Sequence, residues 1–323
     1  MSAAAPGPSP TLIAIDWGTS SMRAYLMGGG GQVLDRRSGP WGIMQVGRDG
    51  FADRLATATD GWHEQGTGGR LPVLVSGMIG SVQGWREAPY VRCPAGLAEI
   101  AAGLTTPDHD VPMAIVPGVL QDDDIPGVMR GEETQIFGAL ESFADWREGA
   151  RIVLPGTHSK WVDIAGGRIS GFATFMTGEL YAVLRQHSIL GRFVPEGAAV
   201  ADGAHEAFRR GVDMMRDTAT TPGLGITSLL FTARSMVLTK RLAPEQSLDY
   251  LSGLLIGEEL RQALSRSGNA PIVLIGDAGL CEKYRAALGR FDAVATVIED
   301  AAPAGLWRIA QSAGLIGGAA AHA

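Results

Sequence analysis

The sequence predicts an α/β protein built from two related halves, and three observations support this prediction. A Gly-Thr hairpin occurs twice, once around Gly18-Thr19 and once around Gly156-Thr157. Apolar strand-like runs alternate with helical patterns after each copy, which is typical of α/β domains. The 323 residues also suffice for two domains, since a domain usually holds about 100 to 200 residues.

Both copies have the order strand, tight turn, strand, glycine turn, strand. Residues 13–26 form the first hairpin and four glycines follow at 28–31, whereas residues 152–164 form the second hairpin and Gly166-Gly167 follows. Glycine accepts the positive φ that tight hairpin turns require, so each copy is expected to form a meander. Two such turns, facing each other across a cleft between the domains, would suit a polyphosphate.

The segment between the two hairpins is expected to mix helices, strands and loops. Helical spacing covers 51–65, and apolar strand-like runs cover 73–76 and 113–116. Residues 87–111 contain three prolines and are expected to be a loop. A helix is expected over 132–147, where the leading carboxylates suit the positive end of a helix.

The segment after the second hairpin is expected to be mainly helical. Helices are expected at about 178–188, 203–217, 228–241, 248–266, 281–289 and 303–313, with strands at 271–275 and 293–298. The organisation expected from these patterns is a tail at 1–11, an N-terminal domain at 12–128, a C-terminal domain at 129–316 and a tail at 317–323.

Composition excludes several classes of protein. The formal net charge is -7 and the chain has no block of lysine or arginine, which argues against a nucleic-acid surface. It has no 18-residue apolar run and no signal-peptide pattern at its start, so no membrane segment and a cytoplasmic location are expected. Cys93 and Cys281 have no paired spacing, which indicates neither a disulfide framework nor a zinc site. The acidic stretch Asp122–Asp124 is expected to be a solvated loop rather than a metal site.

Three common catalytic or nucleotide-binding motifs are missing. The sequence contains no Gly-x4-Gly-Lys-Ser/Thr, no Gly-x-Gly-x-x-Gly between a strand and a helix, and no Gly-x-Ser-x-Gly. A P-loop, a dinucleotide fold and an α/β-hydrolase are therefore disfavoured. The stretch from Thr157 to Lys160 lacks the Ser-x-x-Lys order of a serine nucleophile.

Several sequence blocks resemble the sugar-kinase/actin superfamily. The hairpin Asp16-x-Gly18-Thr19-Ser20 is similar to its first phosphate motif, and Gly156-Thr157 is similar to the second. The loop Gly276-Asp277-Ala278-Gly279 after a buried strand resembles its adenosine motif, although Asp277 stands where a small residue is commoner.

Two further blocks narrow this resemblance. Ser76-Gly77-Met78 is similar to the sugar-contacting loop of carbohydrate kinases, and Glu132-Glu133 lies in a segment similar to their catalytic helix start. With Pro155–Trp161, the blocks in this order resemble the 2-dehydro-3-deoxygalactonokinase family over roughly residues 12 to 315.

The resemblance implies two duplicated ribonuclease H-like domains that bind ATP in the cleft between them. It places the ATP phosphates at the two hairpins, the adenosine at Gly276–Gly279, and Mg²⁺ at Asp16. One carboxylate of the acidic pair would be the catalytic base, with Glu132 preferred over Glu133, although the superfamily mostly uses aspartate. Lys160 lies either near the phosphates or toward solvent.

The implied substrate is a small sugar acid, 2-dehydro-3-deoxy-D-galactonate, phosphorylated at its terminal C6 hydroxyl in galactonate catabolism. Its carboxylate needs a cation, and Arg86, Arg92 and Arg130 are the candidates. Trp85 and Arg86 line the sugar site or, alternatively, are a core tryptophan and a surface arginine. Neither a nucleic acid nor a membrane is an expected partner, and the protein is expected to be a monomer or homodimer.

Three other functions stay open at this point. One is a kinase for a different sugar or sugar acid on the same fold. Another is an actin-like or chaperone-type ATPase, for which about 320 residues leave little chain for a partner-binding domain. A third is a sugar-sensing module, which the intact Asp16 and Glu132 disfavour. These functions can be distinguished by measuring ADP release with and without a panel of sugar acids. Strong stimulation by one acid supports a kinase, and turnover independent of acid supports an ATPase.

Overall fold

The computed structural model describes residues 9–47, 50–66, 69–107, 113–194, 202–218, 223–266 and 270–317. The chain divides into two compact units. The first comprises Met1–Gly149, Asp163–Phe172 and Asp300–Ala323, and the second comprises Ala150–Val162 and Ala173–Glu299. Most of the two expected tails lies outside the described residues, but Pro10 and Thr11 of the first expected tail belong to a strand, so that tail was drawn too long. The expected boundary between 128 and 129 stays a prediction.

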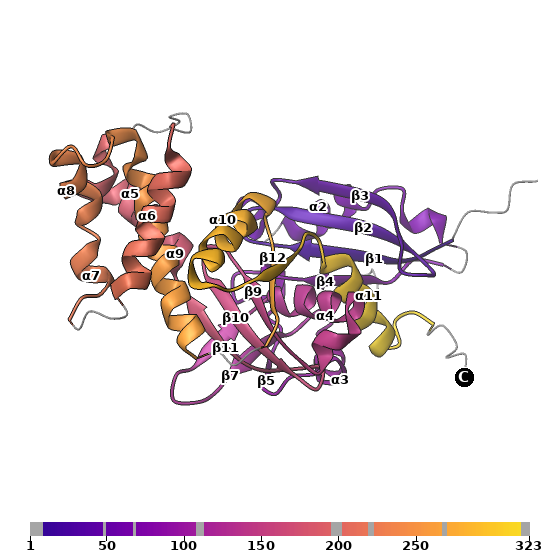
Figure 1. Ribbon diagram of the computed structural model, residues 1–323. Coiled ribbons are helices and arrows are strands. Elements are labelled where there is room, and N and C mark those ends of the chain that lie inside the picture. The colour runs from indigo at the N-terminus through magenta and orange to yellow at the C-terminus, as the bar shows by residue number, and fades with distance from the viewer. Residues whose placement is uncertain are drawn as a thin grey trace, which may run out of the picture. The chain divides into compact units, whose positions relative to one another are not determined.

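The first five-stranded sheet contains the first hairpin. Its strands are β1 (Pro10–Trp17), β2 (Met22–Gly28), β3 (Val33–Gly39), β4 (Val73–Ser76) and β6 (Met113–Ile115), in the order β3-β2-β1-β4-β6. Figure 1 labels the first four strands of this order. The first three strands pair antiparallel, which confirms the first meander, and β4 and β6 extend the sheet in parallel with β1. Polar groups after β1 and β4 therefore share one edge of the sheet.

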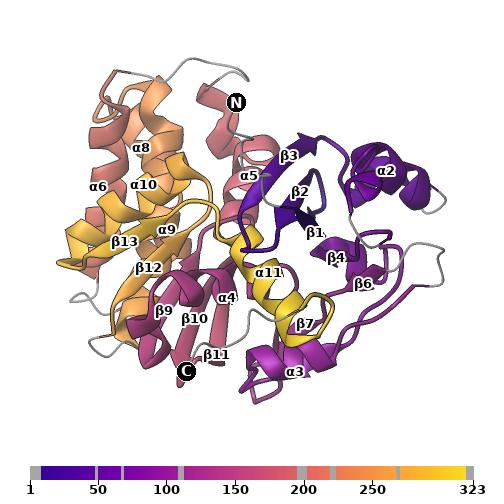
Figure 2. The same ribbon diagram turned by 90° about the vertical axis from the view of Figure 1, so that its right-hand side faces the viewer.

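The second sheet repeats this order position by position. Its strands are β9 (Gly149–Leu154), β10 (Ser159–Ala165), β11 (Arg168–Phe175), β12 (Ile272–Ile275) and β13 (Ala295–Ile298), in the order β11-β10-β9-β12-β13 (Figure 2). Strands β9, β12 and β13 are parallel. The loops after β9 and β12 therefore lie at one edge, as those after β1 and β4 do in the first sheet.

A third, small sheet shows that 87–111 is not simply a loop. It contains β5 (Tyr90–Arg92), β7 (Gly118–Gln121) and β8 (Gly127–Met129), and a helix, α3 (Leu97–Ala102), follows β5. The prediction was wrong because three residues are too few to show an alternating pattern. Their pairing partner β7 lies far along the chain, so the strand depends on tertiary contacts.

In its described part the first unit has four helices besides α3, and the second and third of these four are shorter than expected. The four are α1 (Ile43–Val46), α2 (Phe51–Ala58), α4 (Glu132–Ser142) and α11 (Ala302–Ser312), with single 3-10 turns at His63–Gln65, Met78–Gly80 and Ala144–Arg147. The helix expected over 132–147 ends at Ser142 because Phe143 adopts an extended backbone, which lets its ring stack on Trp146 with centroids 4.0 Å apart.

Helices α4 and α11 pack closely through two glycines. An ideal Cβ on Gly138 would lie 1.9 Å from the Ala301 carbonyl oxygen, and one on Gly305 would lie 1.8 Å from that of Thr134. No side chain fits at either position, so the two backbones touch. Helix α4 begins at the acidic pair, and α11 therefore fixes the position of that pair.

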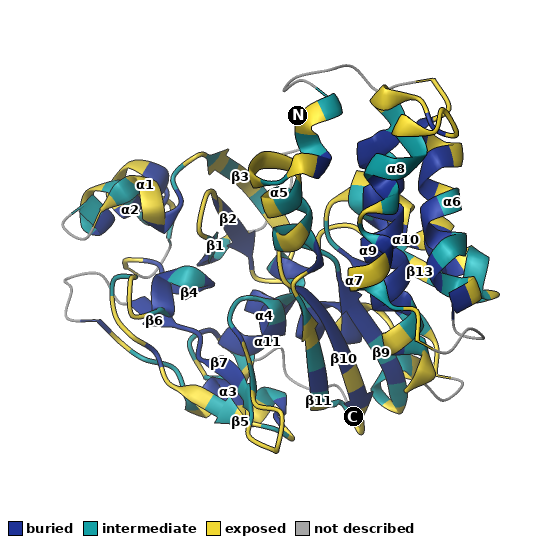
Figure 3. Ribbon diagram, turned by 90° about the vertical axis from the view of Figure 1, so that its left-hand side faces the viewer, coloured by how far each residue is buried: buried dark blue, intermediate teal, exposed yellow. Residues whose placement is uncertain are grey.

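The core of the first unit follows from the continuous apolar runs of its central strands. Residues 12–15 on β1 are inaccessible to solvent, and Ile13 and Ile15 pack in one cluster with Trp17, Phe51 and Trp62 (Figure 3). The Trp17 indole N–H donates to the Trp41 carbonyl oxygen at 2.7 Å, so burial leaves this donor satisfied.

The second unit adds a helical layer. Its helices are α5 (Thr177–His187), α6 (Ala204–Asp217), α7 (Ile226–Leu229), α8 (Thr232–Leu238), α9 (Ser247–Ser265) and α10 (Ala278–Leu288), with 3-10 turns at Ile189–Phe193, Pro244–Gln246 and Gly289–Phe291. The single helix expected over 228–241 is wrong, because the chain turns between α7 and α8 and leaves the helix at Thr239. In the described part of the chain no helix is both long and apolar enough to span a membrane.

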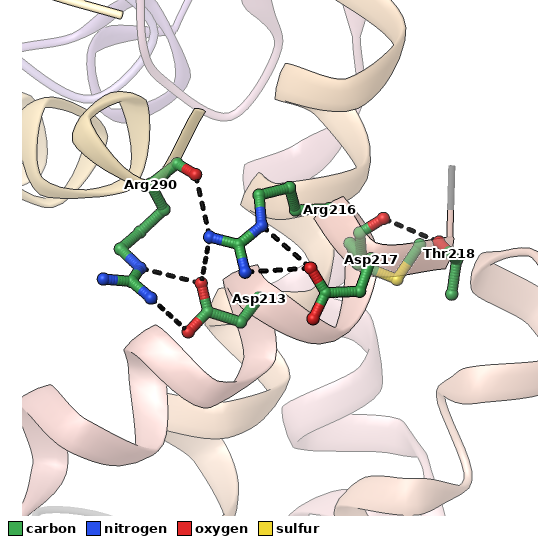
Figure 4. A network of polar contacts seen from close by, with 6 residues as sticks. Asp213, Arg216, Asp217, Thr218 and Arg290 are labelled. Carbon is green, nitrogen blue, oxygen red and sulfur yellow. Dashed lines mark hydrogen bonds and ion pairs between the residues drawn. The ribbon is translucent and has the colours of Figure 1, made fainter. Parts of the chain in front are cut away.

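An ion-pair network lies at the C-terminal end of α6. The Asp213 carboxylate accepts two hydrogen bonds from Arg290, at 2.7 and 2.8 Å, and pairs with Arg216 at 3.1 Å (Figure 4). Arg216 also donates to the Arg290 carbonyl oxygen at 3.0 Å. The bidentate geometry ties the end of α6 to the turn after α10.

Candidate active site

Asp16 lies at the end of β1, opposite Ser76 on β4. Its side chain is 22% exposed, and the nearest cation is Arg23, whose Nη1 is 3.9 Å from Oδ2. Burial raises the pKa of Asp16 to about 6, Arg23 lowers it, and the carboxylates of Asp300 and Glu132 raise it further. A cation at this carboxylate would therefore offset the cost of burying its charge and relieve repulsion among three acids.

This surrounding fits Mg²⁺ better than a metal held by protein alone. Among the described residues no three His, Cys, Asp or Glu side chains are placed to hold one ion. Magnesium keeps several waters and takes one or two carboxylates plus phosphate oxygens. A single partly exposed carboxylate at the end of a strand matches that requirement.

Hydrogen bonds hold the backbone of the first hairpin tip, whereas the side chains at the tip are exposed. The Gly18 N–H donates to the Ser21 carbonyl oxygen at 2.9 Å, and the Met44 N–H donates to that of Thr19 at 3.2 Å. An ideal Cβ on Gly42 would lie 2.2 Å from the Thr19 carbonyl oxygen, so only glycine fits there. Thr19 and Ser20 are exposed, which leaves their hydroxyl groups available.

The sugar loop and the acidic turn predicted from the sequence meet in the first unit. Gly77 and Gly131 have φ angles of 95° and 106°, which glycine adopts without strain. An ideal Cβ on Gly131 would lie 3.2 Å from Gly77 Cα, and one on Gly77 would lie 2.7 Å from the Trp17 carbonyl oxygen. Three backbones thus converge: the end of β1, the loop after β4 and the start of α4.

The two glutamates at the start of α4 have different surroundings. Glu133 is inaccessible, and both of its carboxylate oxygens accept from the Gly131 N–H, at 2.9 and 2.7 Å. Burial, and secondarily the charge of Glu132, raises the pKa of Glu133 to about 8. Glu132 is partly exposed, and one of its oxygens accepts from the Arg130 N–H at 2.9 Å. Only Glu132 is exposed enough to touch a ligand.

The three candidate arginines differ in what they already contact. Arg92 lies on β5 and forms an exposed ion pair with Asp122. Arg86 is exposed. Arg130 donates from Nη2 to the Ala88 carbonyl oxygen at 2.8 Å and lies over the Tyr90 ring, 4.4 Å from its centroid.

Two donors of Arg130 stand out because they are buried. Its Nε and Nη1 atoms have no hydrogen-bond acceptor among the described residues. A buried unsatisfied donor costs free energy, and a carboxylate oxygen could satisfy either of the two. Trp85 is half-buried and stacks on Phe51 with centroids 6.1 Å apart, so at least one ring face packs on the core.

The second hairpin tip, in the second unit, is held in a similar way. The Gly156 N–H donates to Ser159 Oγ at 3.4 Å, and the Glu179 N–H donates to the Thr157 carbonyl oxygen at 3.0 Å. An ideal Cβ on Gly178 would lie 2.4 Å from the Gly156 carbonyl oxygen. Thr157 is exposed. This tip therefore also presents a threonine hydroxyl outward.

The neighbouring side chains complete this tip. His158 is exposed and pairs with Glu179 at the start of α5. Lys160 is buried, with 5% of its surface exposed, so the alternative that it points to solvent is wrong.

The expected adenosine loop lies beside this tip. Gly276 follows β12, and an ideal Cβ on it would be 3.6 Å from the Pro155 carbonyl oxygen. Asp277 begins α10, where its Oδ1 accepts from the Leu280 N–H at 2.9 Å. Asp277 is therefore a helix cap, which explains a carboxylate where a small residue is commoner. Asp277, Ala278 and Gly279 are exposed.

Two acidic residues beside these sites were missed by the sequence reasoning. Asp300 follows β13 and accepts from Arg36 Nη2 at 2.8 Å and from Tyr25 OH at 3.2 Å. Its signal was a carboxylate two residues after the strand expected at 293–298. Glu259 is 1% exposed on α9. Its signal was a glutamate inside the apolar run from Leu254 to Leu260.

Comparisons with known proteins agree with one another. A family model described as 2-keto-3-deoxy-galactonokinase matches residues 16–309. The chain is 42% identical over 283 residues to a protein of Rhizobium meliloti named as a probable 2-dehydro-3-deoxygalactonokinase, covering 85% of this chain and 88% of that protein. It is 35% identical over 304 residues to 2-dehydro-3-deoxygalactonokinase of Escherichia coli, covering 93% and 97%.

A solved structure is similar as well. A crystal structure from Sinorhizobium meliloti, described as a 2-dehydro-3-deoxygalactonokinase protein, superimposes with a TM-score of 0.83 at 38% identity. The match covers 93% of this chain and 98% of that one.

Proposed function

Because this chain belongs to the 2-keto-3-deoxy-galactonokinase family, we propose that it phosphorylates the terminal C6 hydroxyl of 2-dehydro-3-deoxy-D-galactonate with ATP, in the cytoplasm, as a step of galactonate catabolism. The observation that supports the chemistry is the convergence of Asp16, Gly77 and the turn at Gly131–Glu133 in the first unit. We further infer that the two sheets are duplicated ribonuclease H-like units, since their strand orders are the same.

Glu132 is the proposed base. It accepts the proton of the attacking C6 hydroxyl while the hydroxyl oxygen bonds to the γ-phosphorus and the bond to the ADP oxygen breaks. Its partly exposed carboxylate suits contact with substrate, whereas the buried Glu133 instead holds the Gly131 N–H and fixes the turn.

Asp16 is the proposed metal-binding residue. A bound Mg²⁺ would neutralise charge on the phosphate oxygens. Thr19, Ser20 and Thr157 provide exposed hydroxyl groups for the phosphates, and the buried Lys160 adds positive charge beneath the second tip. The adenosine is proposed to lie at Gly276–Gly279, whose exposed residues adjoin Pro155.

Arg130 is proposed to bind the substrate carboxylate, because two of its buried N–H groups lack an acceptor. The ion pair with Asp122 makes Arg92 a weaker candidate. The exposed Arg86 is the alternative candidate, and mutagenesis distinguishes it from Arg130. Arg130→Met should raise the KM for the sugar acid, whereas Arg86→Met should not.

The test is the rate of ADP formation with Mg²⁺, ATP and a panel of acceptors. The galactonate-derived acid should have a kcat/KM far above that of galactose, glycerol and xylulose, because a neutral acceptor leaves the arginine unpaired. Loss of one partner of a buried charge pair costs about 2 to 5 kcal/mol, or roughly 30- to several-thousand-fold. ADP formation that no acceptor stimulates would instead support an ATPase.

A further inference from the structure

Glu259 lies in the second half of α9, next to Glu258 and among mostly apolar residues. Its side chain is 1% exposed, and its neighbours along the helix include the buried Leu255, Ile256 and Leu260. Burying a carboxylate is costly unless hydrogen bonds compensate, and a leucine at this position would pack without that cost. The retained acid therefore needs a reason in its contacts.

Three donors from three separate elements converge on this carboxylate. The Trp161 indole N–H on β10 donates to Oε1 at 2.7 Å, and the Tyr284 hydroxyl on α10 donates to Oε2 at 2.7 Å. The Thr177 hydroxyl at the start of α5 also donates to Oε2. Burial raises the pKa of Glu259, whereas these donors lower it. All three donors favour the ionised form.

The carboxylate also sets the direction of a longer chain of hydrogen bonds. Tyr284 has one hydroxyl proton, and it is given to Glu259. In the 2.8 Å contact between Ser159 Oγ and Tyr284 OH, Ser159 must therefore be the donor. Ser159 Oγ then keeps its lone pairs for the Gly156 N–H, which lies 3.4 Å away. The relay runs Gly156, Ser159, Tyr284, Glu259.

The elements that the relay joins are those that carry the proposed nucleotide contacts. Ser159 and Trp161 lie on the strand after the Gly156-Thr157 tip. Thr177 precedes Gly178, which packs against the Gly156 carbonyl oxygen. Tyr284 lies on α10, the helix that Asp277 of the proposed adenosine loop begins.

We propose that Glu259 is a positioning residue for ATP: through Ser159, Tyr284, Thr177 and Trp161 it holds the second phosphate tip, the start of α5 and the start of α10 in one arrangement. This inference rests on the proposed function, because it assumes that ATP binds at these elements. Glu259 itself is too deeply buried to touch the nucleotide.

The test measures the ATP dissociation constant by calorimetry and both KM values by ADP release, in the full-length protein. Glu259→Gln should raise the dissociation constant and the KM for ATP about 10- to 100-fold, by analogy with the loss found when groups that orient metal ligands are removed. The KM for the sugar acid should stay within about twofold of the wild type. Tyr284→Phe breaks the relay without changing a charge, and should raise the KM for ATP by a smaller factor.

Glu258→Gln is the matched control. Glu258 is the adjacent carboxylate on α9, 9% exposed, and it is held by Arg261 and Gln262 of the same helix. This variant should leave both KM values unchanged. If Glu259→Gln does not fold, Tyr284→Phe and Ser159→Ala decide the question.

The outcomes separate this inference from the proposed function. Lower kcat with unchanged ATP affinity in Glu259→Gln, Tyr284→Phe and Ser159→Ala would show a merely structural role and overturn the inference alone. Wild-type protein that binds ATP but phosphorylates no sugar acid would overturn the proposed acceptor alone. The ATP dissociation constants of the variants would then still test the role of Glu259. Wild-type protein that binds no ATP overturns both.

Discussion

The two Gly-Thr hairpins are built alike but differ at the strand that leads into each turn. In both, a glycine from a later segment, Gly42 or Gly178, approaches the tip so closely that no side chain fits. In both, a later N–H donates to the carbonyl oxygen of the tip threonine, Thr19 or Thr157. The shared construction fixes the backbone and leaves the threonine outward.

The difference lies in the acids. The first hairpin carries Asp16 itself, in contact range of Arg23 and close enough to Glu132 and Asp300 to feel their charge. The second has Leu154 and Pro155 before its turn, and its acid, Glu259, lies buried behind the strand. One hairpin is thus suited to hold a cation, and the other only to present hydroxyl and N–H groups in a fixed arrangement.

The largest expected effect tests whether the chemistry belongs to the first unit. Glu132→Gln should lower kcat by about 100- to 10,000-fold, because an amide cannot accept the hydroxyl proton. Binding of the sugar acid, measured by calorimetry, should persist. Glu133→Gln is the matched control on the same helix turn and should reduce kcat less, since Glu133 is inaccessible. If Glu133→Gln lowers kcat more than Glu132→Gln does, Glu133 and not Glu132 is the catalytic base.

Asp16→Asn should lower turnover by about 100-fold or more while the protein stays folded, because a preorganised charge interaction in the transition state is lost.

The pKa of about 6 for Asp16 also predicts that the activity depends on pH. Asp16 gains a proton as pH falls below about 6, so kcat/KM should fall up to tenfold per pH unit there, and added Mg²⁺ should shift the fall to lower pH. A rate unaffected by pH between 5 and 7 would contradict this role.

The smallest expected effect applies the same change to both tips. Gly42→Ala and Gly178→Ala each place a Cβ within 2.5 Å of a carbonyl oxygen, and each should destabilise the fold by about 1 to 3 kcal/mol in urea unfolding. Only Gly178→Ala should mainly raise the KM for ATP, whereas Gly42→Ala should mainly lower kcat. Gly289→Ala, which meets no atom within 4 Å, is the control. Equal changes in kcat and in the KM for ATP in Gly42→Ala and Gly178→Ala would contradict the proposed difference between the two hairpins.

Local patterns predicted the parts of this fold that depend on local interactions. The first hairpin, the parallel strands after it and the start of α4 at Glu132 follow from glycine turns, apolar runs and leading carboxylates. Strand β5 did not follow, because three residues become a strand only when β7 pairs with them. The breaks at Phe143 and Thr239 also depend on packing rather than on helix propensity.

Much of the candidate site was predictable because its residues stand next to the turns that expose them. Asp16, Gly77 and Glu132 were identified from sequence, and the first unit brings their backbones together. The separation of Glu132 from Glu133 was not predictable in physical terms, since one residue of helix rotation decides which carboxylate is buried. Glu259 acts through neighbours that are up to about 100 residues distant in sequence, which no local pattern shows.

The contact between Gly138 and Gly305 has a consequence for the order of events during synthesis. Helix α4 carries the proposed base, and its backbone packs on α11, which begins at Ala302. A ribosome adds α11 only after the whole second unit, so the first unit waits for its final helix while the second is already translated. Contacts this distant in sequence slow folding and prolong exposure of apolar surface. The acidic turn therefore reaches its packed position only late, and a nascent chain shorter than about 312 residues should lack activity.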